Sequence, residues 1–238
     1  MKRFSTVAPF LLWAVAACAP AMPISPQQVS AIKTIGIISA IGNQVEIKNV
    51  VALRPMEVYW RLPGNGQVDD LVVKRLGDLL APRFEIRPVT YARAKFFDAW
   101  RGPALNELVR TEVTPQGLDA YVVVTPTVRM LGVSGVLLTG IGLLETGSGI
   151  FGYEDQLYTL YKITVIDGRQ LAILGSQGAT LGNDSIVIAG PHRDVDHALW
   201  AESAAEMSDA HRAQLDTEIK DLVDRSLPLT LHALGLVN

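Results

Sequence analysis

Leu118-Asp119-Ala120-Tyr121-Val122-Val123-Val124-Thr125 is the stretch that sets the fold most clearly. It is a short apolar run rich in β-branched residues, a composition typical of a strand buried on both faces of its sheet. Such a strand requires neighbours on either side and cover above and below. The stretch therefore predicts a strand within a covered sheet.

On the C-terminal side of this stretch, the sequence predicts a β-hairpin. Residues 156–166 form a strand and end at Asp167-Gly168, a residue pair that favours a tight turn. Residues 171–175 would then pair back antiparallel to the first strand.

On the N-terminal side, a second hairpin is predicted. Residues 33–40 form an apolar, β-branched strand, and Gly42-Asn43 is another pair that favours a two-residue turn. Residues 44–53 would be the return strand, so the two strands are expected to be antiparallel neighbours.

Helical segments lie between and after these strands. Apolar residues three and four apart predict a helix over 67–81, and shorter patterns predict a strand at 84–89 and a helix at 103–112. A long helix is predicted over roughly 198–226, with Pro228 interrupting it. Their order favours an α/β (α+β) fold, a single mixed sheet with β-hairpins covered by helices and a long C-terminal helix.

The N-terminus has the order of a bacterial secretory signal peptide. A basic start at Met1-Lys2-Arg3 precedes a short apolar run that ends at the only cysteine, Cys18. Residues 1–18 therefore predict a lipoprotein signal peptide whose lipobox cysteine, Cys18, is acylated, for instance with palmitate. A plain signal peptidase site at Ala17-Cys18-Ala19 or Ala19-Pro20-Ala21 stays open as an alternative.

Residues 19–32 contain three prolines and predict an extended, semi-rigid tether between the anchor and a single domain at 33–238. Ala19 after the cysteine favours the outer membrane if the source is Gram-negative. The expected location is therefore the cell envelope, on the periplasmic side. A formal net charge of −3 without a basic cluster argues against nucleic acid as a partner.

The segments Gly117–Thr125 and Tyr161–Leu174, followed by a long terminal helix, resemble a domain found in envelope proteins. The order of elements over roughly 33–236 is similar to that of the curli-secretion-channel lipoproteins, the N-terminal domain of the Tol propeller protein and the penicillin-binding-protein activator lipoproteins. The resemblance implies a binding or assembly module rather than an enzyme. It transfers no functional residue.

One loop has the spacing of metal ligands. Pro191 to His197 supplies nitrogen and oxygen donors of the kind that bind zinc, and the candidate ligands are His192, Asp194, Asp196 and His197. The competing interpretation is a polar loop whose aspartates cap the following helix.

Residues 131–152 form an apolar insert with seven glycines. Three interpretations compete: a sheet-capping loop or extended hairpin, a mobile apolar surface for a partner, and a membrane-inserting hairpin of a pore. The candidate partner-binding residues of the second interpretation are Leu137, Leu138, Ile141, Leu143 and Leu144.

No serine lies in the G-x-S-x-G pattern of a nucleophile elbow, and no catalytic residue is assigned. The expected function is therefore a membrane-anchored, non-catalytic binding or assembly module that needs no cofactor, with envelope proteins as partners and a homo-oligomer as a possible form. The alternatives are a metal-dependent periplasmic hydrolase using the 192–197 loop and an oligomeric pore-forming or secretion subunit.

Overall fold

The computed structural model describes residues 21–51, 59–64, 66–100, 104–131, 135–148, 152–182 and 188–237. The strands are β1 (Thr34–Ser39), β2 (Gln44–Val51), β3 (Tyr59–Pro63), β4 (Glu85–Arg87), β5 (Thr90–Tyr91), β6 (Val113–Thr114), β7 (Ala120–Pro126), β8 (Val128–Leu131), β9 (Val136–Ser148), β10 (Gly152–Asp167), β11 (Ile173–Gly178) and β12 (His192–Asp194). The helices are α1 (Pro26–Ala31), α2 (Gln67–Leu80), α3 (Arg93–Phe97), α4 (Leu105–Glu112) and α5 (Asp209–Leu234), with short 3-10 helices η1 (Asp98–Trp100) and η2 (His197–Leu199).

A mixed sheet of ten strands carries the fold, in the order β3-β2-β9-β10-β7-β1-β4 along its main path. β8 pairs with β9, while β11 and β12 both pair with β10. The predicted class, a mixed sheet with helical cover and a long C-terminal helix, is confirmed.

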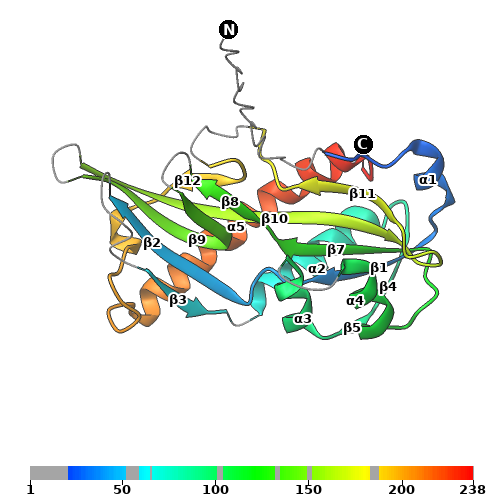
Figure 1. Ribbon diagram of the computed structural model, residues 1–238, viewed down its shortest axis with the longest axis horizontal. Helices are drawn as coiled ribbons and strands as arrows, with labels where there is room; N and C mark the ends of the chain where they lie inside the picture. The colour runs from blue at the N-terminus through cyan, green and yellow to red at the C-terminus, as the bar shows by residue number, and fades with distance from the viewer. Residues whose placement is uncertain are drawn as a thin grey trace, which may run out of the picture.

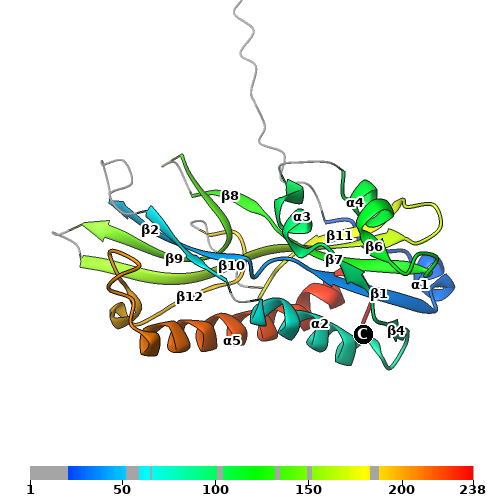
Figure 2. The same ribbon diagram turned by 90° about the horizontal axis from the view of Figure 1, so that it is seen from below.

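Two layers of helix cover the sheet. Figure 2 shows α2 and α5 along one face, with α3 and α4 on the other. The larger core lies under α2 and α5, where Leu76 and Leu222 pack against sheet residues such as Val122. A smaller core joins Phe96 of α3 and Val109 of α4 to the opposite sheet face.

β7 is the buried strand that the sequence predicts. All seven of its residues are buried, and it lies between β1, which is parallel to it, and β10, which is antiparallel. The predicted hairpin at 156–175 is also confirmed, because β10 pairs antiparallel with β11.

The predicted hairpin between residues 33–40 and 44–53 is wrong. β1 and β2 do not pair with each other; they lie end to end along the sheet, and β2 pairs with β3 and β9 instead (Figure 2). A tight I′ hairpin turn needs positive φ at both central residues, and neither Gly42 nor Asn43 has one. The carboxylate of Asp69 instead binds the junction, accepting from Ile41 N at 2.7 Å and Ser39 Oγ at 2.7 Å.

The glycine-rich insert forms the long strand β9, which lies between β2 and β10. Its hairpin with β10 agrees with the extended-hairpin interpretation, although residues 149–151 lie outside the described residues. Gly142 has a steric role, because a Cβ there would come within 2.2 Å of the Tyr158 hydroxyl oxygen.

The proposed apolar surface is contradicted at four of its five candidate residues. The side chains of Leu138, Ile141, Leu143 and Leu144 are buried, and only Leu137 is exposed. The physical reason is that β9 is an interior strand with cover on both faces: Ile141 and Leu143 face the core under α2 and α5, and Leu138 and Leu144 face a small core with Tyr158.

The C-terminal helix begins and ends later than predicted. Ser208 caps α5, with its side chain accepting from His211 N at 3.2 Å, and Pro228 lies inside the helix. A proline inside a helix costs about 3 kcal/mol, but Leu215, Ile219 and Leu231 on its buried face outweigh that cost. Among the described helices, none is both long enough and apolar enough to cross a bilayer.

The expected tether at 19–32 is docked on the domain over its described part. Met22 pairs with Ser176 of β11, Ile24 is buried, and residues 26–31 form α1 behind a capping box at Ser25. Apolar side chains at 24, 29 and 32 explain the difference, because burying them stabilises a docked segment over an extended one.

Candidate functional site

The four candidate metal ligands in the 192–197 loop do not meet at one point. His192 Nδ1 lies 2.8 Å from Gly190 O, and Asp194 accepts from Gln156 Nε2 at 3.1 Å. Asp196 caps η2, accepting from Ala198 N at 2.8 Å. The helix-capping interpretation is confirmed for Asp196, and the predicted four-ligand site is wrong because β12 and this cap direct the side chains to different partners.

Of the four, only His197 joins Glu145 and Asp155 in a cluster of metal-type donors. Its Nδ1 lies 2.6 Å from Asp155 Oδ2 on β10 and 3.6 Å from Glu145 Oε1 on β9. Strand register explains the meeting: Glu145 pairs with Asp155 across β9 and β10, and Asn49 of β2 pairs with Glu145 on the other side. Asn49 Nδ2 donates to Glu145 Oε2. We call Asn49, Glu145, Asp155 and His197 the carboxylate–histidine cluster.

The cluster contains two buried carboxylates beside an exposed imidazole. Glu145 and Asp155 are only 5% and 6% exposed, whereas the His197 side chain is 65% exposed. Burial and the neighbouring Asp155 raise the pKa of Glu145. The hydrogen bond with Asp155 raises the pKa of His197. The site therefore attracts positive charge, whether as a proton or as a cation.

Sequence reasoning missed Asn49, Glu145 and Asp155. Two of them carry a signal in the sequence, because each lies two residues from a buried apolar residue and so on the same face of its strand. Glu145 follows Ile141 and Leu143 at this spacing, and Asp155 precedes Leu157. Their convergence needs three strands in register, which the sequence pattern does not specify.

A second feature is a groove on the sheet face that carries α3 and α4. Two adjoining cavities of about 340 and 590 Å³ share the residues Ala99, Leu105 and Lys162. The floor is formed by residues of β7, β10 and β11, among them Thr125, Lys162, Thr164 and Ser176. We call this the α3–α4 groove.

The groove has a cationic and hydroxyl-rich floor. Among the described residues, no carboxylate forms an ion pair with Lys162. Thr164 is 1% exposed and its Oγ1 has no hydrogen-bond partner in the described part of the chain. Leu105, Leu171 and Ile173 supply apolar lining at the same place. An elongated ligand with an anionic group would fit this arrangement.

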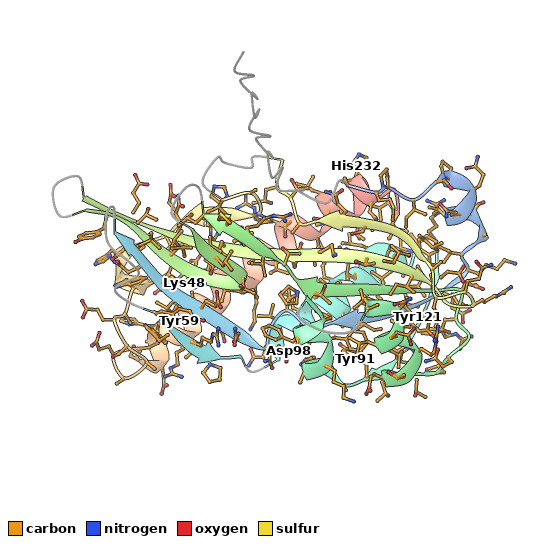
Figure 3. All side chains as sticks on the ribbon, viewed as in Figure 1. Lys48, Tyr59, Tyr91, Asp98, Tyr121 and His232 are labelled. Atoms are coloured by element: carbon orange, nitrogen blue, oxygen red, sulfur yellow. The ribbon has the colours of Figure 1, made fainter. Side chains whose placement is uncertain are left out.

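A third cluster is a buried ion pair on β2. Lys48 Nζ lies 2.6 Å from Glu46 Oε2 and also donates to the backbone oxygen of Leu137. Figure 3 shows Lys48 beside Tyr59 of β3, whose hydroxyl donates to Glu46 Oε1 at 3.3 Å. These groups satisfy one another and hold the start of β9 against β2, so we assign them a structural role.

No family model matches the sequence, and no curated protein matches it. Among solved structures, a Xanthomonas campestris protein of the family model DUF330 is similar at 12% identity and a TM-score of 0.36, covering 90% of this chain and 88% of that one. The lipoprotein GNA1162 of Neisseria meningitidis is similar at 11% identity and a TM-score of 0.28, covering 82% of this chain and 99% of that one.

A hypothetical protein of Chlamydia trachomatis is similar at 11% identity and a TM-score of 0.27, covering 82% of this chain and 98% of that one. TM-scores this low carry no argument about fold or function. The resemblance to the curli-channel and Tol N-terminal domains therefore stays a prediction.

Proposed function

We propose that this protein is a lipid-anchored envelope protein that binds an extended, acidic segment of a partner protein in the α3–α4 groove. The observation that carries the proposal is the floor of that groove, where Lys162 and the buried hydroxyl of Thr164 have no partners among the described residues. Buried polar groups in native proteins are nearly always hydrogen-bonded, so a ligand that satisfies them is expected.

The lining selects the chemistry of the ligand. Lys162 favours a carboxylate, and Asn106 and Ser176 offer hydrogen bonds to a peptide backbone. A lipid chain suits this floor poorly, because its hydrocarbon would leave the threonine hydroxyls unsatisfied. An extended peptide with an acidic side chain fits better.

The anchor and the groove lie close together in this proposal. Met22 exchanges backbone hydrogen bonds with Ser176, which also lines the groove, at 2.9 Å each way. Three residues lie between Cys18 and Met22, and a fully extended chain spans at most about 3.6 Å per residue. Acylated Cys18 would therefore hold this side of the domain near the bilayer surface. The partner is therefore expected to be a membrane protein or to bind at the membrane.

Site-specific photo-crosslinking in intact cells tests the groove. A photoreactive residue at Asn106 is expected to crosslink one partner, whereas the same residue at Lys74, on α2 across the sheet, is not. Lys162→Glu is expected to reduce the Asn106 crosslink at least about tenfold, because it places two negative charges together in a partly buried site.

The matched control is Lys74→Glu, which has the same charge change on an exposed side chain. Equal crosslinking from Asn106 and Lys74, or an Asn106 crosslink unchanged by Lys162→Glu, would contradict the proposal. The acidic character of the ligand is tested by replacing acidic residues in the crosslinked peptide, which should reduce the yield in the same way.

A further inference from the structure

The carboxylate–histidine cluster has the donor atoms of a metal site. One ligand atom from each of Glu145, Asp155 and His197 lies within 4.8 Å of the other two. Two of these residues are buried carboxylates on neighbouring strands, so their charges repel each other in a poorly hydrated place. A divalent cation would neutralise both charges.

An independent observation points to a missing ligand. Asp155 Oδ1 and Asn49 Oδ1 are buried and have no hydrogen-bond partner in the described part of the chain. The Asp155 side chain is 3% exposed, and Asn49 is 7% exposed. The bond from Asn49 Nδ2 to Glu145 holds the amide against the cluster. Oxygens left unpaired at such burial are rare in native proteins, and a cation bound at the cluster would satisfy Asp155 Oδ1.

We propose that the carboxylate–histidine cluster binds one divalent transition-metal ion and that Zn²⁺ is the best fit. Imidazole nitrogen with carboxylate oxygen is a common zinc ligand set, and zinc is usually four-coordinate. His197, Glu145 and Asp155 supply three ligands, which leaves the fourth position of a zinc ion for water. This is not the site that the 192–197 loop suggests, because only His197 is shared.

The ion has a structural consequence. His197 begins η2, and the segment that follows reaches Trp60 of β3, whose Nε1 donates to Ala201 O at 3.1 Å. A metal bridge from His197 to β9 and β10 would therefore fasten the 197–208 segment, which leads into α5, onto the end of the sheet. Zinc binding should raise the melting temperature of the whole domain, because a ligand of the folded state stabilises it.

The test uses the purified protein without its leader, freed of metal by a chelator and titrated with ZnCl₂. One Zn²⁺ per chain and a higher melting temperature are expected for the unchanged sequence. His197→Gln and Glu145→Gln are expected to weaken zinc binding at least about tenfold, as losing a ligand costs no less than losing its supporting hydrogen bond. His192→Gln is the matched control, since this histidine lies in the same loop and bonds Gly190 O.

Co²⁺ provides a second measurement of binding, because its visible absorption reports ligation by nitrogen and oxygen and does not depend on the stability of the protein. Displacement of Co²⁺ by one equivalent of Zn²⁺ in the titration spectra would support the site. Circular dichroism verifies that each variant is folded. Absence of zinc binding at micromolar concentration would overturn the proposal. So would equal loss of binding in His192→Gln and His197→Gln, or a melting temperature that falls in His197→Gln while zinc leaves the unchanged protein unaffected.

Discussion

At the scale of single residues, two aspartates, Asp69 and Asp119, stabilise strand junctions by accepting hydrogen bonds from backbone N–H groups. Asp119, inside the stretch that sets the fold, accepts from Lys33 N and Thr34 N at 3.0 Å each and from Thr34 Oγ1 at 3.1 Å. These bonds, led by that from the Thr34 backbone, lower the pKa of Asp119 below its usual value of 3.8. One carboxylate thus fastens the start of β1 beside β7.

Asp119→Asn is expected to lower the free energy of unfolding at neutral pH by about 1.5–3 kcal/mol, the range for hydrogen bonds to a charged group. Because the folded-state pKa is lowered, this stability is present above pH 3.8 and is lost as the pH falls through the folded-state value. Urea unfolding at neutral pH and at about pH 2 measures the difference, which should shrink in acid.

The control is Asp78→Asn on α2, an exposed carboxylate paired with Lys74, where a change within about 0.5 kcal/mol is expected. A penalty for Asp119→Asn that is the same at both pH values would show that the charge of Asp119 is not what stabilises the junction.

At the scale of elements, β9 shows what burial on both faces demands of a sequence. Gly142 of β9 packs against the Tyr158 side chain of β10 and the backbone of β2. An added Cβ would lie 2.2 Å from the Tyr158 hydroxyl oxygen and 2.6 Å from Glu46 O. Within the insert that the sequence leaves open between a capping loop or extended hairpin, a mobile surface and a membrane-inserting hairpin, residues 136–148 form an interior strand. The glycine makes room for a neighbouring strand and an aromatic ring.

Gly142→Ala is expected to destabilise the domain by about 1–3 kcal/mol, the usual cost of overpacking a core. Gly77→Ala on α2 is the matched change, because nothing lies within 4 Å of its Cβ position, and it should stabilise by about 0.5–1 kcal/mol through helix propensity. Thermal or urea unfolding of the two variants measures both effects. If Gly142→Ala were as harmless as Gly77→Ala, the close packing of β9 would be refuted.

At the scale of the whole molecule, the first described residues determine which side of the domain the proposed anchor at Cys18 would face. Met22 and Ile24 lie on β11 and the end of α5, so the chain enters beside the α3–α4 groove. Figure 1 shows α1 at the β1–β7 end of the sheet, beside the C-terminus of the chain. Cys18 itself lies outside the described residues.

Cys18→Ala is expected to abolish incorporation of labelled palmitate and to release the domain from the membrane fraction, because acylation requires this thiol. The Asn106 crosslink to a membrane partner should fall in the same variant through loss of local concentration. Metabolic labelling and fractionation of cells measure both. Incorporation of labelled palmitate into the Cys18→Ala variant would contradict the proposed lipid anchor.

The local pattern alone determined the buried strand at 118–125, the hairpin at 156–175 and the helix at 67–81, because alternation and helical periodicity report burial over a few neighbouring residues. It misplaced β2, because the Gly42-Asn43 pair favours a turn that the carboxylate of Asp69 overrides from α2.

Only the tertiary structure decided that Asn49, Glu145 and Asp155 lie opposite one another on three neighbouring strands and that His197 contacts the two carboxylates. Asn49 and Glu145 are ninety-six residues apart in the chain, and strand register across such a separation depends on which surfaces pack together. Periodicity along a segment says which residues are buried. It does not say which distant side chain each one meets.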